Sequence, residues 1–196
     1  MAENCWVIVP AYNECARIGE VVASIVNRGY PVAVVDDGST DATAELAGCE
    51  GAHVVRHPIN CGQGAALQTG IEFALAMGAD YIVTFDGDGQ HSTADLDGML
   101  TPLVSGEVHF TLGSRSLGRA IDMPWSRTLV LRAATWFTRL VTPMPITDTH
   151  NGFRGMTRHA AQFIQLRQHR MAHASEILEQ IMRSGLRFKE VPVTVR

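Results

Sequence analysis

The chain has 196 residues, 46% hydrophobic and 18% charged, which suits one globular domain spanning residues 1–196 and argues against disorder. Residues 1–114 carry a charge balance of −12, whereas residues 115–196 carry +8, which indicates different ligands for the two halves or, as the alternative, an accident of surface composition. The acidic first half lacks a basic-aromatic pattern, which argues against nucleic-acid binding.

In the first half, apolar runs alternate with stretches of helical periodicity. The expected strands are WVIVP (6–10), PVAVVDD (31–37), AHVVRH (52–57), DYIVTFD (80–86) and HFTLGSR (109–115). One expected helix has Ile18, Val21, Val22, Ile25 and Val26 on one face, and another is marked by Leu67, Ile71, Ala74 and Leu75. Between them a short helix is expected at Thr40–Leu46 with Ser39 or Thr40 as its cap, and a further segment is capped by Ser92. This alternation predicts a mostly parallel α/β sheet with helices on both faces.

The second half is less regular. A helical stripe of Leu129, Ala133, Trp136, Phe137 and Leu140 comes first, and TPMPITDTHNGFRG (142–155) is expected to be a loop. A helix around residues 173–184 and a strand KEVPVTVR (189–196) are predicted to complete the domain.

Three expected strands end in the most polar stretches of the chain. These stretches are PAYNE (10–14), DDGSTD (36–41) and DGDGQH (86–91). Ligands of parallel α/β sheets bind at the carboxyl ends of the strands. The coincidence therefore predicts one shared site at this edge of the sheet.

Two carboxylates, Asp86 and Asp88, stand one residue apart at the end of the fourth expected strand. Like charges this close repel unless a cation or a proton lies between them. Oxygen ligands without cysteine suit Mg²⁺ or Mn²⁺, and Gln90 can add an oxygen and His91 a nitrogen. The alternative is a solvated acidic turn. An EF-hand loop requires glycine at the position of His91.

The glycine-rich stretch NCGQGAALQTG (60–70) has neither the Gly-Lys-Ser/Thr of a Walker A loop nor, because of Leu67, the third glycine of a dinucleotide fingerprint. Gly62 and Gly64 allow a tight turn into a helix whose N-terminus can face an anion. A plain loop-to-helix junction is the alternative. Asp36 and Asp37 either form a turn before a helix or hydrogen-bond a base or ribose.

Six motifs occur in the order seen in family 2 glycosyltransferases. They are IVPAYNE (8–14), VVDDGSTD (34–41), NCGQGAALQTG (60–70), FDGDGQH (85–91), GSR (113–115) and DTHNGFR (148–154). The chain resembles this family over nearly its whole length, and most closely the dolichol- or polyprenyl-phosphate sugar transferases. The resemblance implies the GT-A fold and transfer of a hexose from a GDP- or UDP-sugar, with the sugar left open.

The resemblance also implies roles for individual residues. The nucleotide-sugar positions are Pro10, Tyr12, Glu14, Asp36, Asp37, Gly64, Asp86 and Arg115. The positions that hold Mn²⁺ or Mg²⁺ against the donor diphosphate are Asp86, Asp88 and Gln90. The acceptor or phosphate positions are Arg127 and Arg154, and Asp148 belongs to the same acceptor-side motif. For Arg154, an ordinary ion pair is the alternative.

By this resemblance, the reaction is a metal-dependent transfer that inverts the anomeric carbon and requires stabilisation of the leaving diphosphate. A lipid phosphate, the expected acceptor, is already ionised. A saccharide hydroxyl, the alternative, needs a general base, for which Asp148 is the first candidate and Glu176 the second. Nucleotidyl transfer is disfavoured because PAYNE replaces the glycine-rich basic loop it requires. An inactive nucleotide-sugar-binding relative is disfavoured because Asp86, Asp88 and Asp148 are present.

Four cysteines, Cys5, Cys15, Cys49 and Cys61, show neither a CxxC pair nor zinc spacing, which indicates reduced thiols of a cytosolic protein. The sequence has no signal-peptide pattern and no run of about 20 apolar residues. We therefore expect a cytoplasmic protein with, at most, peripheral contact with the cytoplasmic membrane face. The Trp136/Phe137 stripe either belongs to the core or contacts that membrane surface.

Overall fold

A computed structural model describes residues 4–118, 146–149, 151–166 and 172–195. Its strands are β1 (Cys5–Ala11), β2 (Val32–Asp36), β3 (His53–Arg56), β4 (Tyr81–Thr84), β5 (Phe110–Ser114), β6 (Arg154–Thr157) and β7 (Phe188–Pro192). Its helices are α1 (Ile18–Val26), α2 (Thr43–Cys49), α3 (Gln63–Ala76), α4 (Leu96–Val104), α6 (Arg158–Ala161) and α7 (Ala172–Ser184), with a 3-10 turn η1 (Thr93–Asp95) before α4.

All seven strands form one sheet in the order β3-β2-β1-β4-β6-β5-β7. β6 runs antiparallel to both of its neighbours, and the other pairings are parallel. The expected mostly parallel α/β sheet is thereby confirmed. The strand order reverses between β1 and β4, and this switch point is where such sheets bind ligands.

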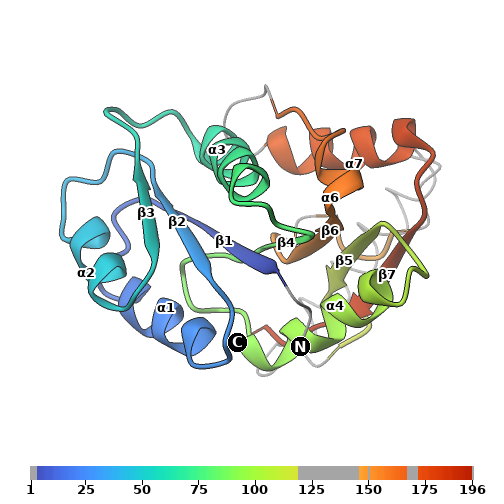
Figure 1. The fold of residues 1–196 in the computed structure, drawn as a ribbon, viewed down its shortest axis with the longest axis horizontal. Coiled ribbons are helices and arrows are strands. Elements are labelled where there is room, and N and C mark those ends of the chain that lie inside the picture. Colours follow the sequence, from blue (N-terminus) through green and yellow to red (C-terminus); the bar gives the residue numbers. More distant parts are fainter. Residues whose placement is uncertain (1–3, 119–145, 150, 167–171, 196) are drawn as a thin grey trace, which may run out of the picture.

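Helices cover both faces of the sheet, with α1, α2 and α4 on one face and α3, α6 and α7 on the other (Figure 1). Successive residues of β1 point to opposite faces, as the period of a strand requires. Val7 and Val9 join the core on the α1 side, whereas Trp6 and Ile8 join the core on the α3 side. Because both faces are buried, the central strands β1 and β2 are nearly continuous apolar runs.

β6 corrects the expectation that residues 142–155 form a loop that reaches Gly155. The strand begins at Arg154 and pairs with both β4 and β5. Its sequence, RGMT, has little strand propensity, so its neighbours determine its conformation. At Gly155 a Cβ atom would lie 2.3 Å from Thr111 Oγ1, and glycine is therefore required where β6 enters the sheet.

Two predicted ends are also wrong. The second helix begins at Thr43, and neither Ser39 nor Thr40 caps it, because both residues bond to Asn13 of the loop after β1. The last strand stops at Pro192, although the Val193 amide still donates to the Ser114 carbonyl at 3.2 Å. The helix expected around 173–184 is confirmed as α7, and Ser92 caps η1 as expected.

Some expectations fall outside the described residues. The stripe from Leu129 to Leu140 and the candidate Arg127 belong to this part of the chain. No helix among the described residues is both long and apolar enough to cross a membrane.

Gly70 sets the distance between α3 and β1. A Cβ atom at this position would lie 2.2 Å from Ile8 Cγ2, a core atom of β1. We predict that Gly70→Ala lowers the free energy of unfolding by about 1–3 kcal/mol through overpacking, measured by urea denaturation. Gly48→Ala in α2 is the control, because its Cβ meets nothing closer than 3.9 Å. Equal effects of the two substitutions would contradict the prediction.

Candidate active site

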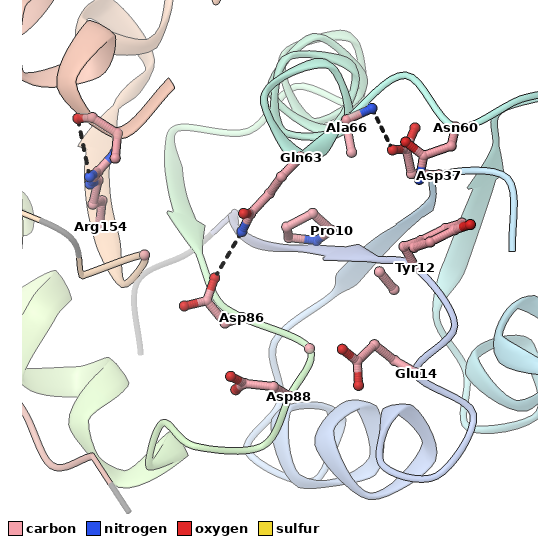
Figure 2. A pocket seen from close by; sticks show the side chains of 15 residues that line it. Pro10, Tyr12, Glu14, Asp37, Asn60, Gln63, Ala66, Asp86, Asp88 and Arg154 are labelled. Atoms are coloured by element: carbon pink, nitrogen blue, oxygen red, sulfur yellow. Dashed lines mark hydrogen bonds between the residues drawn. The ribbon is translucent and has the colours of Figure 1, made fainter. Parts of the chain in front are cut away.

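The carboxyl ends of β1 and β4 open into a cavity of about 520 Å³. Several of the predicted site residues line this cavity, and most of them lie at or just after the ends of β1, β2 and β4. The lining residues are Pro10, Ala11, Tyr12, Glu14, Asp37, Asn60, Gly62, Gln63, Ala66, Asp86, Gly87, Asp88, Gly152, Arg154 and Ala174. Residues from distant parts of the sequence thus meet at the switch point (Figure 2).

The loop after β1 places Glu14 in the cavity. Its backbone is anchored to the segment after β2, because the Glu14 amide donates to Thr43 Oγ1 at 2.8 Å. Figure 2 shows the Glu14 side chain reaching toward the loop that carries Asp88. Burial, followed by the negative charge of Asp88, raises the pKa of Glu14 above its usual value. Negative charge is therefore concentrated between the ends of β1 and β4.

Asp86 is held from three directions. His91 Nε2 lies 3.0 Å from its Oδ2 atom, and Gln63 Nε2 donates to its Oδ1 atom at 3.4 Å. Gly152 covers the third side so closely that a Cβ there would lie 2.4 Å from both carboxylate oxygens. His91 is itself buried against the rings of Phe85 and Phe153. These contacts fix the carboxylate of Asp86 at the wall of the cavity.

Asp88 is held mainly by its own turn. Its Oδ1 atom accepts a hydrogen bond from the Gln90 amide at 2.9 Å, and the intervening Gly89 has φ +74°, a conformation that favours glycine. The Gln90 side chain is exposed, and it is not among the residues that line the cavity.

The two aspartates after β2 have different surroundings. Asp36 is fully buried, pairs with Arg56 at 3.0 Å, and does not line the cavity. Asp37 lines it but also accepts hydrogen bonds from His57 Nδ1 at 2.7 Å and from the backbone of Cys61 and Gly62. The structure thus brings Asp37, and not Asp36, to the predicted nucleotide site.

The glycine-rich stretch does form a tight turn into α3. Gly62 has φ +93° and is the N-cap, and Gly64 is buried in the first turn. The amides of Cys61 and Gly62 both bond to Asp37. The anion found at this turn is therefore the carboxylate of Asp37.

Arg115 and Asp148 form a bidentate ion pair beside the cavity. Arg115 Nε and Nη2 donate to the two carboxylate oxygens at 2.8 and 2.9 Å, and the Arg115 amide donates at 3.1 Å. Burial alone would raise the pKa of Asp148, but the hydrogen bonds from Arg115 outweigh it and hold that pKa below its usual value. This arrangement favours an anchoring role for Asp148 over a role as general base.

Arg154 is 4% exposed at the start of β6 and lines the cavity. Its Nη2 atom donates long hydrogen bonds to the carbonyl groups of Thr149 and Ala174, at 3.4 and 3.5 Å. Burial lowers its pKa to about 10, against the opposing effect of Asp86 and Asp148, so it is cationic at neutral pH. Glu176, the second candidate base, lies in α7 and is half-buried.

The residue types suit a hard dication. Glu14, Asp86 and Asp88 all line the cavity and carry carboxylate oxygens, the ligands that Mg²⁺ and Mn²⁺ prefer. A different cluster, Asp37, His57 and Cys61, has potential ligand atoms within 4.8 Å of one another. Its Asp37 oxygens already accept the His57 and backbone hydrogen bonds described above, so we interpret this cluster as a structural support.

The family model described as Glycosyl transferase family 2 matches residues 6–164. The chain belongs to glycosyltransferase family 2. A relative of this glycosyltransferase, an uncharacterized protein of Methanocaldococcus jannaschii, is 36% identical over 97% of this chain and 81% of its own length. Another, the UDP-N-acetylglucosamine–dolichyl-phosphate N-acetylglucosaminyltransferase of Methanococcus voltae, is 30% identical over 96% of this chain and 84% of its own length.

The structure of this glycosyltransferase has the GT-A fold. A crystal structure of glucosyl-3-phosphoglycerate synthase from Mycobacterium tuberculosis, in complex with Mn²⁺, UDP and glucosyl-3-phosphoglycerate, matches with a TM-score of 0.77 at 23% identity. The match covers 100% of this chain and 71% of that one. The expected family, fold and enzyme class are thereby confirmed.

Several contacts around the cavity of this glycosyltransferase could not be predicted from its sequence. Gln63 and Gly152 lie within quoted motifs, but nothing in their spacing indicates that they contact Asp86. His91 was considered as a metal ligand, yet its Nε2 atom faces Asp86. Glu190, which bonds to the turn of Asp148, lies outside every motif. A pattern of apolar alternation carries no signal for such contacts.

Gly152 offers a test of how strictly Asp86 must be placed. We predict that Gly152→Ala displaces the Asp86 carboxylate and lowers the rate of sugar transfer by roughly 10- to 100-fold. Gly98→Ala in α4 is the control, because its added Cβ would make an ordinary contact of 3.8 Å with Val191. Steady-state kinetics and thermal unfolding are measured for both. Wild-type kinetics in Gly152→Ala would contradict the placement of Asp86.

Proposed function

We propose that this glycosyltransferase transfers a hexose from a UDP- or GDP-sugar to a polyprenyl or dolichyl phosphate, with inversion at the anomeric carbon. The observation that carries this proposal is the convergence of Glu14, Asp86 and Asp88 on a cavity at the switch point of a GT-A sheet. The name of the Methanococcus voltae relative supports the lipid acceptor, and the bound UDP of the mycobacterial structure supports the donor class.

The β1 side of the cavity is the proposed site of the nucleotide. Tyr12 is 48% exposed and lines the cavity beside Pro10, so its ring is available to pack against a base. Asp37 is fixed by His57 and the Cys61–Gly62 backbone, which leaves it rigid for contact with base or ribose. Because Asp36 is buried against Arg56, we propose that it supports Asp37 from behind.

Asp86 and Asp88 are the proposed ligands of Mn²⁺ or Mg²⁺, and Gln90 of the same loop is the proposed third ligand. When bound, such a cation stabilises the negative charge that develops on a leaving diphosphate. His91, Gln63 and Gly152 keep Asp86 in place, so this part of the site is preorganised.

We propose that the arginine residues at the site, Arg154 and Arg115, bind the acceptor. Arg154 lines the cavity, and Arg115 is outside the lining but close enough to Asp86 to interact with its charge. A carboxylate with a lowered pKa is a weak proton acceptor, which disfavours Asp148 as the base that a hydroxyl acceptor needs. A phosphate acceptor is already ionised and needs no such base. A lipid acceptor would also bring the protein to a membrane surface, where the net positive charge of residues 115–196 favours anionic headgroups.

Asp88→Asn tests the metal-dependent part of the proposal. We predict that the wild type releases UDP or GDP from a nucleotide sugar only with Mn²⁺ or Mg²⁺, and that Asp88→Asn lowers this rate by at least about 100-fold. Asp80→Asn is the control, because Asp80 is an exposed acid at the opposite end of β4. Equal rates with metal and with chelator would overturn the metal site.

The acceptor is tested by comparing three reactions for each sugar donor. Each of UDP-N-acetylglucosamine, UDP-glucose and GDP-mannose is incubated with undecaprenyl phosphate, with a saccharide, or with buffer alone. We predict that product forms with the lipid phosphate and that the rate changes little between pH 6.5 and 8.5, because the acceptor is already ionised. Transfer to the saccharide alone would refute the lipid acceptor. Flotation with anionic vesicles tests the membrane contact separately.

A further inference from the structure

Glu190 of β7 contacts a turn that is distant in the sequence. Its Oε1 atom accepts hydrogen bonds from the Thr147 amide at 2.7 Å, the Thr147 hydroxyl at 2.9 Å and the Asp148 amide at 3.3 Å. The side chain of Glu190 is half-buried. One carboxylate oxygen thus accepts hydrogen bonds from the backbone amides of Thr147 and Asp148, where the motif of residues 148–154 begins.

The same turn is tied to the end of β5. Thr147 Oγ1 lies 2.6 Å from Ser114 Oγ. Asp148 receives the side-chain and backbone hydrogen bonds of Arg115. A series of hydrogen bonds therefore connects Glu190, through the Thr147–Asp148 turn, to the guanidinium group of Arg115.

The fold alone does not require a carboxylate at this position. β7 pairs with β5 through the backbone, with Glu190 opposite Leu112, and any strand-forming residue can make that ladder. Residues 147 and 148 lie outside helices and strands, so without Glu190 their amides lose the partner that the structure gives them. An unpaired amide in a partly buried turn is costly, and the turn would shift to find another.

We infer that Glu190 is a positioning residue of the acceptor side: it fixes the Thr147–Asp148 turn and thereby sets the orientation of Arg115 toward the substrate. This inference rests on the proposed function only in giving Arg115 and Asp148 a role in the reaction. Glu190 itself touches no reacting atom and lies outside the cavity lining.

Two substitutions of Glu190 test whether its hydrogen-bond-accepting oxygen is what the turn requires. Glu190→Ala removes the acceptor oxygen, whereas Glu190→Gln keeps a side-chain oxygen that can accept the same hydrogen bonds. We expect Glu190→Ala to lower kcat/KM for undecaprenyl phosphate by about 10- to 100-fold, while the Kd of UDP or GDP with Mn²⁺ changes less than about twofold. Glu190→Gln is expected to restore most of the activity. Lys189→Ala is the control, because Lys189 pairs with Glu107 on the surface.

Amide hydrogen exchange gives a readout that does not depend on turnover. The Thr147 and Asp148 amides are expected to exchange about tenfold faster in Glu190→Ala than in the wild type, and amides of β1 are expected to be unchanged. Kinetics of Glu190→Ala combined with Arg115→Ala complete the test. If Glu190 acts through Arg115, the double variant is no slower than Arg115→Ala alone.

The results separate failure of this inference from failure of the proposed function. Unchanged exchange at Thr147 and Asp148, or additive losses in the double variant, would overturn the positioning role even in an active enzyme. A wild type that transfers no sugar to the lipid phosphate would refute the proposed function, and the exchange rates would still decide whether Glu190 holds the turn.

Discussion

Repulsion between carboxylates at one edge of the sheet is the constraint on which the site depends. Glu14 and Asp88 come from the ends of neighbouring strands, and burial, followed by the negative charge of Asp88, raises the pKa of Glu14. Among the described residues, neither Glu14 nor Asp88 forms an ion pair like those of Asp36 with Arg56 or Asp148 with Arg115. The charge of Arg17 lowers the pKa of Glu14 and so opposes this effect, and a fold that keeps such carboxylates together gains further by binding a cation there.

Other acids of the motifs have partners within the protein. Asp36 pairs with Arg56 and Asp148 pairs with Arg115, and Asp37 is hydrogen-bonded to His57. These pairs hold the loops after β2 and β5 in place, so the same residue type serves two purposes. Asp36 and Asp148, which pair with arginine, lie outside the cavity lining, whereas Asp37, Asp86 and Asp88, which do not, belong to it. A count of aspartates in a motif does not distinguish the two, because the difference lies in partners from elsewhere in the chain.

Features that depend on neighbouring residues could be predicted from the sequence, and features that depend on contacts between distant segments could not. Strand–helix alternation and apolar faces are local, so β1 to β5 and α7 were expected nearly at their observed ends. β6 was missed because its four residues become a strand only between two partners. The start of α2 was misplaced because Ser39 and Thr40 bond to Asn13 across the site. Contacts such as Gly152 with Asp86 depend on two segments meeting, which no local pattern encodes.

The antiparallel direction of β6 explains how the motif at residues 148–154 reaches the cavity. The motifs after β1, β2 and β4 follow their strands, because parallel strands end at the same edge of the sheet. β6 runs the other way, and Arg154 pairs with Thr84 at the end of β4. The residues that precede β6 therefore lie at the edge where β4 ends, and Thr84 Oγ1 fixes the Gly152 carbonyl at 2.6 Å. A parallel strand in this place would carry the motif to the opposite edge, away from Asp86.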